Sequence, residues 1–348
     1  MSVFGNRRKK LLSLAKGKQL VATKPSNIFY LTDFWGGGAA VVHEDRTLLV
    51  TSALDAQRAK EVGKEVEVVV VKRWADLPLR VGRELESGKV LVDDDSQFRK
   101  GRRYGWSPGL FLEARRVKDE VEVARINNAS RGQDKVFEAL EREIRPGRTE
   151  WEIAAEALKI ATMSELTQSG SDSALSPIIV ASGENGALPH GELSERRIRN
   201  GDFVVADIFF RSEGYNSDET RTFAVGTVSS EMKGHYRAVL DAQERALETV
   251  KEGATCGEVN EAAVKALRVH GVEKHLTHGI GHGVGIDIHE LPSISKGSKV
   301  RLVRNDVVTV EPGVYFPGRY GIRIEDTVKV DKKPFPLTHY TKELVTVG

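Results

Sequence analysis

Short apolar runs alternate with amphipathic stretches through residues 19–92 of the chain. The apolar runs predict strands at Leu20–Thr23, Ala39–Val42, Leu48–Thr51 and Val66–Val71. The stretches between them have apolar positions at helical spacing and predict helices at Ala53–Val62 and Trp74–Leu85. Alternation of strands and helices indicates an α/β domain, which we assign to residues 1–112.

The pattern changes near Arg115-Arg116, and longer amphipathic segments follow over residues 113–348. Asp119 with Glu122 predicts the start of a long helix that runs toward Ile144. The same capping pattern begins further helices at Thr149 and Thr255. Apolar runs predict strands at 202–210, 220–226, 306–311 and 322–330. Long helices interleaved with hairpins indicate an α+β second domain.

Composition removes several classes of function. The formal net charge of the 348 residues is +2, which gives no reason to expect a nucleic-acid partner. Two short basic runs, at 7–10 and 99–103, are expected to be solvated surface. The apolar stretch Leu11–Ala15 is too short for a signal peptide, and no segment is long enough to span a bilayer. The single cysteine, Cys256, excludes an internal disulfide framework, so we expect a cytoplasmic protein without membrane contact.

Two aspartates interrupt the predicted hairpin of residues 202–226. Asp207 lies inside an otherwise apolar strand, and Asp218 precedes the return strand. A turn near residues 212–213 would place the two carboxylates directly opposite each other, with Cβ atoms about 5 Å apart. That separation allows two carboxylates to share two cations about 3.5–4 Å apart.

Two glutamates repeat this arrangement. Glu311 ends one predicted strand, Glu325 ends another, and Gly318 lies midway between them. A loop centred on Gly318 would bring these carboxylates across neighbouring strands. Four like charges at one site repel strongly unless cations neutralise them.

One histidine completes the set. His282 lies in the run His278–Gly285, whose glycines permit close approach of the backbone. The run does not fit a dinucleotide-binding loop, and His289-Glu290 lacks the second histidine of a single-zinc protease helix. Taken singly, each of the five residues has an ordinary explanation as a turn, strand-end, surface or loop residue. Taken together, they predict a hydrolase with two metal ions.

The same residues belong to motifs that resemble one family, the pita-bread metallopeptidases, specifically Xaa-Pro dipeptidase (prolidase) and aminopeptidase P. The motifs are Lys24–Thr32, Arg116–Glu122, Ile178–Gly183, Pro189–Gly191, Gly214–Thr222, Gly281–Gly283, Ile288–Glu290, Val310–Gly313 and Gly321–Asp326. The resemblance implies a creatinase/prolidase-like α/β N-terminal domain and a pita-bread α+β catalytic domain. It also implies a homodimer.

The resemblance further implies a role for each residue. Asp207 would bind one metal ion, Asp218 and Glu325 would bridge both, and His282 and Glu311 would complete the second site. Glu311 would also accept the proton of the attacking water. His190 and His289 would line the substrate pocket and stabilise the tetrahedral intermediate or the leaving nitrogen. Arg323 would hold a ligand carboxylate, with a surface salt bridge as the alternative, and would contribute to substrate binding.

The expected substrates are small peptides with proline at the second position. Oxygen and nitrogen ligands without thiolate suit two divalent ions per chain, Mn²⁺ or Co²⁺ first and Zn²⁺ or Fe²⁺ as the other choices. One position departs from several microbial prolidases, which carry an arginine where this chain has Ser293. Arg319 or a basic residue of the first domain would then have to read a dipeptide's carboxylate. This departure leaves open an aminopeptidase P acting on longer Xaa-Pro-Yaa peptides.

Two further alternatives share the fold. A metal-free hydrolase of the creatinase type or a non-catalytic binding module of the pita-bread class would be expected to lose ligands. This chain retains all five candidate ligands. A metal-dependent Xaa-Pro dipeptidase is therefore the function that the resemblance implies.

Overall fold

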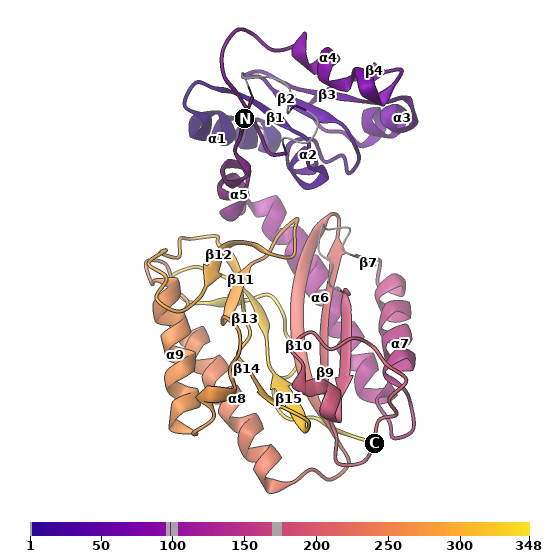
Figure 1. The fold of residues 1–348 in the computed structure, drawn as a ribbon, viewed down its shortest axis with the longest axis vertical. Helices are drawn as coiled ribbons and strands as arrows, with labels where there is room; N and C mark the ends of the chain where they lie inside the picture. Colours follow the sequence, from indigo (N-terminus) through magenta and orange to yellow (C-terminus); the bar gives the residue numbers. More distant parts are fainter. Residues whose placement is uncertain (1, 95–97, 99–103, 169–175) are drawn as a thin grey trace. The chain divides into compact units, whose positions relative to one another are not determined.

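The computed structural model describes residues 2–94, 98, 104–168 and 176–348. The chain divides into two compact units, Met1–Arg116 and Val117–Gly348 (Figure 1). The boundary expected after residue 112 falls inside α5 (Pro108–Arg116), the helix that ends the first unit. Each unit has its own buried core.

The first unit is built on a six-stranded mixed sheet with the order β4-β3-β2-β1-β5-β6. β2 is antiparallel to β1 and β3, whereas the other neighbouring strands are parallel. The sheet packs with helices around a core made mainly of valines, with Leu48, Leu77 and Phe98. The elements are α1 (Val3–Ala15), β1 (Gln19–Ala22), α2 (Pro25–Thr32), β2 (Ala39–Val42), β3 (Thr47–Ser52), α3 (Ala53–Val62), β4 (Val66–Val71), α4 (Leu77–Gly82), β5 (Val90–Val92) and β6 (Tyr104–Trp106). The α/β prediction for this unit is confirmed.

One local prediction for the first unit is confirmed only in part, and another is wrong. The helix expected over Trp74–Leu85 is a 3₁₀ turn, Trp74–Asp76, followed by the short α4, which has a proline in its first turn. The basic run at 7–10 is not simply solvated surface, because α1 buries Arg7 and Arg8. The Arg7 guanidinium donates to the Tyr30 carbonyl at 3.0 Å and lies over the Tyr30 ring, 4.9 Å from its centroid. The second run, at 99–103, lies outside the described residues.

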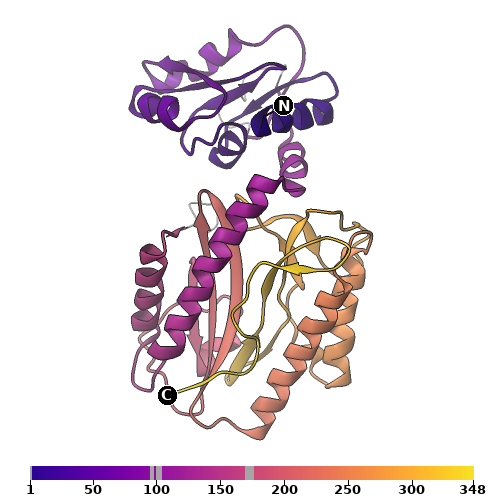
Figure 2. The same ribbon diagram turned by 180° about the vertical axis from the view of Figure 1, so that it is seen from behind.

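The second unit contains two sheets, each with a pair of helices. The first sheet has the order β18-β10-β9-β7, with β8 also paired to β9, and it packs against α6 and α7. The second has the order β12-β11-β13-β16-β17 and lies beside α8 and α9, with a separate hairpin of β14 and β15. Figure 1 shows the strands in front of these helices, and Figure 2 shows α6 across the strands from behind, so the helices cover one face. This arrangement confirms the α+β prediction.

The bounds of the helices are α6 (Glu120–Glu143), α7 (Glu150–Met163), α8 (Ser230–Thr249) and α9 (Cys256–Val269). The capping boxes predicted at Asp119, Thr149 and Thr255 are all present. The strands are β7 (Thr167–Gln168), β8 (Ile178–Ser182), β9 (Phe203–Ser212), β10 (Tyr215–Val225), β11 (Gly281–Gly283), β12 (Glu290–Ile294), β13 (Val307–Val310), β14 (Gly313–Phe316), β15 (Tyr320–Arg323), β16 (Asp326–Lys329), β17 (Phe335–Pro336) and β18 (Thr346–Val347). No helix among the described residues combines the length and apolarity needed to cross a bilayer.

Candidate metal centre

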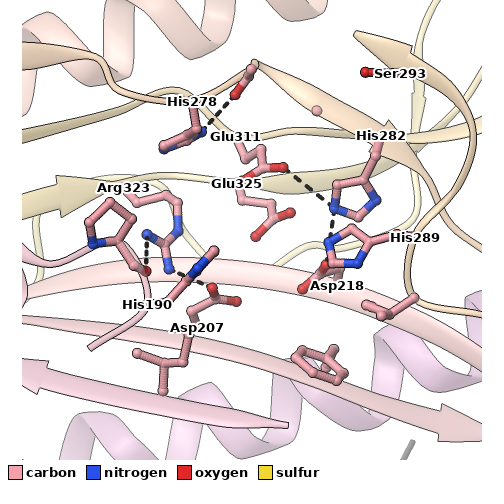
Figure 3. A pocket seen from close by; sticks show the side chains of 16 residues that line it. His190, Asp207, Asp218, His278, His282, His289, Ser293, Glu311, Arg323 and Glu325 are labelled. Carbon is pink, nitrogen blue, oxygen red and sulfur yellow. Dashed lines mark hydrogen bonds and ion pairs between the residues drawn. The ribbon is translucent and has the colours of Figure 1, made fainter. Parts of the chain in front are cut away.

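A cavity of about 270 Å³ in the second unit brings together the five candidate metal ligands with His190, His289 and Arg323 (Figure 3). Its volume lies just below the range of about 300–1,000 Å³ that is typical of small-molecule sites. The lining residues come from β8, β9, β10, β11, β12, β15 and the segments next to them. They include His190, Asp207, Asp218, His282, His289, Ser293, Glu311, Arg323 and Glu325, together with Ile179, Phe209 and His278.

The hairpin of β9 and β10 positions the two aspartates, but its register differs from the prediction. Asp207 is opposite Thr220 and Asp218 is opposite Phe209, so the aspartates are diagonal neighbours on one face instead of a direct pair. The cause is the turn, which uses Glu213 and Gly214, both with positive φ. This two-residue turn is centred one position later than residues 212–213 and shifts the pairing accordingly. The two carboxylates still face one cavity.

The two glutamates lie where two antiparallel ladders meet. Val310 pairs with Asp326 in one ladder, and Gly313 pairs with Arg323 in the other. Both ladders keep a register centred on Gly318, as the sequence predicted, so Glu311 and Glu325 occupy corresponding positions between them. The prediction of a single strand over 322–330 is wrong, because the chain leaves β15 and enters β16 at this point. The Glu325 amide instead donates to Thr220 O at 3.1 Å, which fixes this glutamate against β10.

His282 has its proton on the side away from the carboxylates. Nδ1 is 3.0 Å from Gly283 O, a carbonyl that can only accept, so Nδ1 carries the hydrogen. Burial and the neighbouring His289 lower the pKa of His282 to about 4, so the imidazole is neutral at pH 7. The lone pair of Nε2 therefore faces Glu311 Oε1 at 3.4 Å and Asp218 Oδ2 at 3.6 Å.

Glycine at position 281 makes this placement of His282 possible. A Cβ atom at Gly281 would lie 2.1 Å from the Thr309 carbonyl oxygen, so β11 approaches β13 too closely for any side chain there. The Thr309 hydroxyl accepts a hydrogen bond from the His282 amide at 3.0 Å and donates one to Glu311 Oε1 at 3.4 Å. One threonine thus holds two of the candidate ligands.

The buried carboxylates lie close together and have too few hydrogen-bond donors around them. Burial and the charges of Asp207 and Glu311 raise the pKa of Asp218 well above its usual range, and Asp218 Oδ1 is buried with no hydrogen-bond partner. Burial, with the charge of Asp218 next, also raises the pKa of Glu325. Burial raises the pKa of Glu311 to about 7. Donor atoms of Asp218, His282 and Glu325 all lie within 4.8 Å of one another.

These features test whether the residues fit a divalent cation. A neutral nitrogen lone pair and the carboxylates of Asp218, Glu311 and Glu325 converge on one space, and Asp218 Oδ1 is buried there without a hydrogen-bond donor. A cation among them would remove the conflict and would receive the oxygen and nitrogen ligands that first-row divalent metals accept. The donor set therefore fits such a metal.

Arg323 links Asp207 to Tyr315 and His278, two residues that were not predicted from the sequence. Its guanidinium donates to Asp207 Oδ2 at 2.5 Å and to the Tyr315 hydroxyl at 2.6 Å. The Tyr315 hydroxyl in turn lies 2.9 Å from Nε2 of His278, whose pKa burial lowers to about 4. His278 lies in the same glycine-rich run as His282, and this position was a sequence signal that could have identified it. The sequence around Tyr315 contains no such signal. Arg319 does not line this cavity and pairs with Glu231 at 2.6 Å.

The segment that carries His190 is held by a buried carboxylate. Glu150, at the start of α7, accepts hydrogen bonds from the backbone and hydroxyl of Ser182 at 2.7 and 2.8 Å. Its other oxygen accepts from the backbone and hydroxyl of Ser194 at 3.1 and 2.7 Å. The chain between these two serines, which includes His190, is therefore fixed at both ends.

Comparison with known proteins identifies the family. Residues 124–332 match metallopeptidase family M24, and residues 7–104 match the creatinase/prolidase N-terminal domain. The chain belongs to metallopeptidase family M24. An Xaa-Pro dipeptidase of Pyrococcus furiosus is 34% identical over 315 residues, which cover 88% of this chain and 89% of the relative.

Solved structures of M24-type proteins agree with this assignment. The Xaa-Pro dipeptidase from Bacillus anthracis has a TM-score of 0.89 at 30% identity, covering 99% of this chain and 100% of the other. The X-Pro aminopeptidase from Thermotoga maritima has a TM-score of 0.86 at 29% identity, covering 98% and 99%. The resemblance to pita-bread metallopeptidases and the fold class are thereby confirmed, and both dipeptidase and aminopeptidase relatives share the fold.

Proposed function

We propose that this M24 metallopeptidase hydrolyses Xaa-Pro dipeptides with two divalent cations bound in the cavity. The observation that carries the proposal is the set of acceptors without donors around His282 Nε2 and Asp218 Oδ1. The relatives named Xaa-Pro dipeptidase support the substrate class. Mn²⁺ or Co²⁺ are the first choices for the metal.

We assign the ligands that the resemblance implies. Asp207 would hold one cation, His282 and Glu311 would hold the other, and Asp218 and Glu325 would contribute to both sites. When bound, the cations polarise the scissile carbonyl and lower the pKa of the attacking water. This polarisation suits a bond to proline, whose nitrogen has no N–H for an enzyme to recognise.

The chain's own side chains supply proton transfer and orientation. Glu311, held by the Thr309 hydroxyl, accepts the proton of the attacking water and passes it on. His190 and His289 line the cavity, where their ring N–H groups can donate to the developing oxyanion or the leaving nitrogen. Arg323 keeps Asp207 in place.

A second candidate, cleavage of longer Xaa-Pro-Yaa peptides, is favoured by one observation. Among the described lining residues Arg323 is the only lysine or arginine, and it is already engaged with Asp207 and Tyr315. Ser293 lines the same cavity and carries no charge. A dipeptide presents its carboxylate close to the scissile bond, whereas a longer peptide presents a neutral peptide group there.

A substrate panel separates the two candidates. Protein loaded with Mn²⁺ or Co²⁺ is assayed on Met-Pro and Leu-Pro, on matching Xaa-Pro-Yaa tripeptides and on Xaa-Ala controls, with metal content measured on the same sample. Cleavage of the dipeptides supports the proposal, and cleavage of tripeptides alone reverses the order of the candidates. A protein that takes up no metal and cleaves none of these peptides would refute both. The homodimer and the cytoplasmic location remain predictions, which light scattering and cell fractionation would test.

A further inference from the structure

A loop between β11 and β12, residues 284–289, carries His289 to the cavity. The His289 ring contacts the ring of His282, with centroids 4.3 Å apart. The position of this loop therefore decides where one cavity imidazole lies relative to a candidate metal ligand (Figure 3).

One side of the loop is fastened to β10. The Asn216 backbone amide donates to Gly285 O at 2.8 Å, and its side-chain amide donates to Ile286 O at 2.7 Å. These bonds hold the first half of the loop. The two bonds end at Gly285 and Ile286, before Asp287 and His289.

Glu290, the residue next to His289, contacts the second half of the loop. Its Oε1 accepts a hydrogen bond from the Asp287 amide at 3.1 Å. The carboxylate lies over Gly285, where a Cβ atom would be 2.6 Å from Oε2. Glu290 thus connects the end of the loop to Asp287 within it. A side chain at position 285 would displace the Glu290 carboxylate from this place.

The Glu290 carboxylate is in turn held by Lys118. Lys118 Nζ lies 2.9 Å from Glu290 Oε2, and the two side chains are 0% and 1% exposed. The lysine is fixed through its own backbone, which donates to Asn305 O at 2.9 Å. Without the Lys118 ammonium, the buried Glu290 carboxylate would have to move into solvent, take up a proton or gain a water molecule. Each of these changes would disturb its other contacts.

We propose that Lys118 is a positioning residue, whose ammonium holds Glu290 so that the loop 284–289 presents His289 to the reacting groups. Neither Lys118 nor Glu290 lines the cavity. The inference rests on the proposed function, because it assigns the loop a part in turnover. The competing explanation is that the ion pair stabilises the fold and has no effect on His289.

Two variants separate these explanations. Lys118→Met leaves Glu290 buried without its ammonium, and we expect Tm to fall by roughly 10 °C. Lys118→Met/Glu290→Met removes both charges, and apolar replacement of a whole buried pair is expected to return Tm to within a few degrees of wild type. Lys159→Met is the matched control, since it breaks a lysine–glutamate pair of 3.0 Å whose lysine is 61% exposed.

The readouts are hydrogen exchange of the loop amides and steady-state kinetics on an Xaa-Pro substrate. In both variants we expect exchange in residues 284–289 to rise at least about tenfold, because the Asp287 amide loses its acceptor or its geometry. We expect kcat to fall about tenfold, with KM within about threefold of wild type. Lys159→Met should match wild type in every measurement.

The double variant gives the decisive result. Restored Tm together with wild-type exchange and kcat, within twofold, would overturn the proposal, since the pair would then be structural only. If the double variant does not fold, Lys118→Met decides: faster exchange confined to the loop supports the proposal, and uniform acceleration over the second unit contradicts it. Exchange requires neither metal nor substrate. A wild-type protein inactive on all Xaa-Pro peptides would therefore refute the proposed function without altering the exchange result.

Discussion

Substitution of Glu311 by glutamine should make the metal-free protein more stable at neutral pH. Glu311 ionises among Asp207, Asp218 and Glu325, and burial raises its pKa from an ordinary 4.5 to about 7. A carboxyl whose pKa is higher in the folded state binds more protons there than in the unfolded chain. The contribution of Glu311 to stability is therefore greatest below pH 4.5 and falls as the pH rises toward 7. Glutamine has the shape of the protonated acid and removes this dependence.

The size of the effect follows from the same values. The difference between 4.5 and about 7 corresponds to about 3 kcal/mol of unfolding free energy. This is an upper figure, because the Glu311 side chain is 18% exposed and water screens part of the repulsion. For a unit of this size, 3 kcal/mol corresponds to roughly 6–12 °C in Tm.

The assay is calorimetric unfolding of chelator-stripped wild type and Glu311→Gln at pH 4.5, 6 and 8. We expect the two Tm values to be similar at pH 4.5 and the variant to be the more stable at pH 8. Saturating Mn²⁺ should reverse the order, since ligand at 100 times its Kd adds about 2.7 kcal/mol per site to a protein that binds it. The variant should also lose turnover while keeping its fold. Parallel Tm curves for the stripped proteins across this pH range would refute the reasoning about crowded carboxylates.

Two further substitutions test the groups around the ligands. Glu150→Gln places an amide donor against the backbone amide of Ser182 or Ser194, so we expect a loss of about 2–3 kcal/mol in urea unfolding, with faster hydrogen exchange between those serines. Unchanged stability and exchange would mean that the carboxylate is not needed there. Arg323→Lys keeps the charge but cannot reach Asp207 and its other acceptors together, so we expect metal affinity, measured by calorimetric titration, to fall about 10–100-fold. Metal affinity equal to that of wild type would show that Asp207 keeps its orientation without the Arg323 guanidinium.

The candidate ligands could be predicted from the sequence because strand patterns constrain them. The loop centre at Gly318 followed from the spacing of Glu311 and Glu325, and both ladders keep that register. The aspartate hairpin was placed one position too early in the chain. Its turn uses Glu213 in a positive-φ conformation, which a non-glycine residue adopts rarely, so local propensity favoured a different centre.

The supporting residues could not be predicted in the same way. Lys118 and Glu290 are 172 positions apart, and nothing local to either residue indicates that the two charges are buried together. Arg7 shows the same limit in the first unit, because a basic run looks like solvated surface until the Tyr30 carbonyl that receives it is known. A sequence reports which charges exist, whereas burial depends on partners that only the folded chain brings close.

The hydrogen bonds that the Arg323 guanidinium already makes affect the choice of substrate as well as the position of the candidate ligand Asp207. Its Nε donates to Thr220, one Nη to both Pro189 and Tyr315, and the other Nη to Asp207, so four of the five N–H groups of a guanidinium are engaged. A side chain used in this way acts as a support for Asp207, and reading a substrate carboxylate would require it to release one of these acceptors. The predicted substrate-binding role of Arg323 is therefore weaker than its role in holding a ligand. Discrimination between a dipeptide and a longer peptide must then come from groups other than this guanidinium.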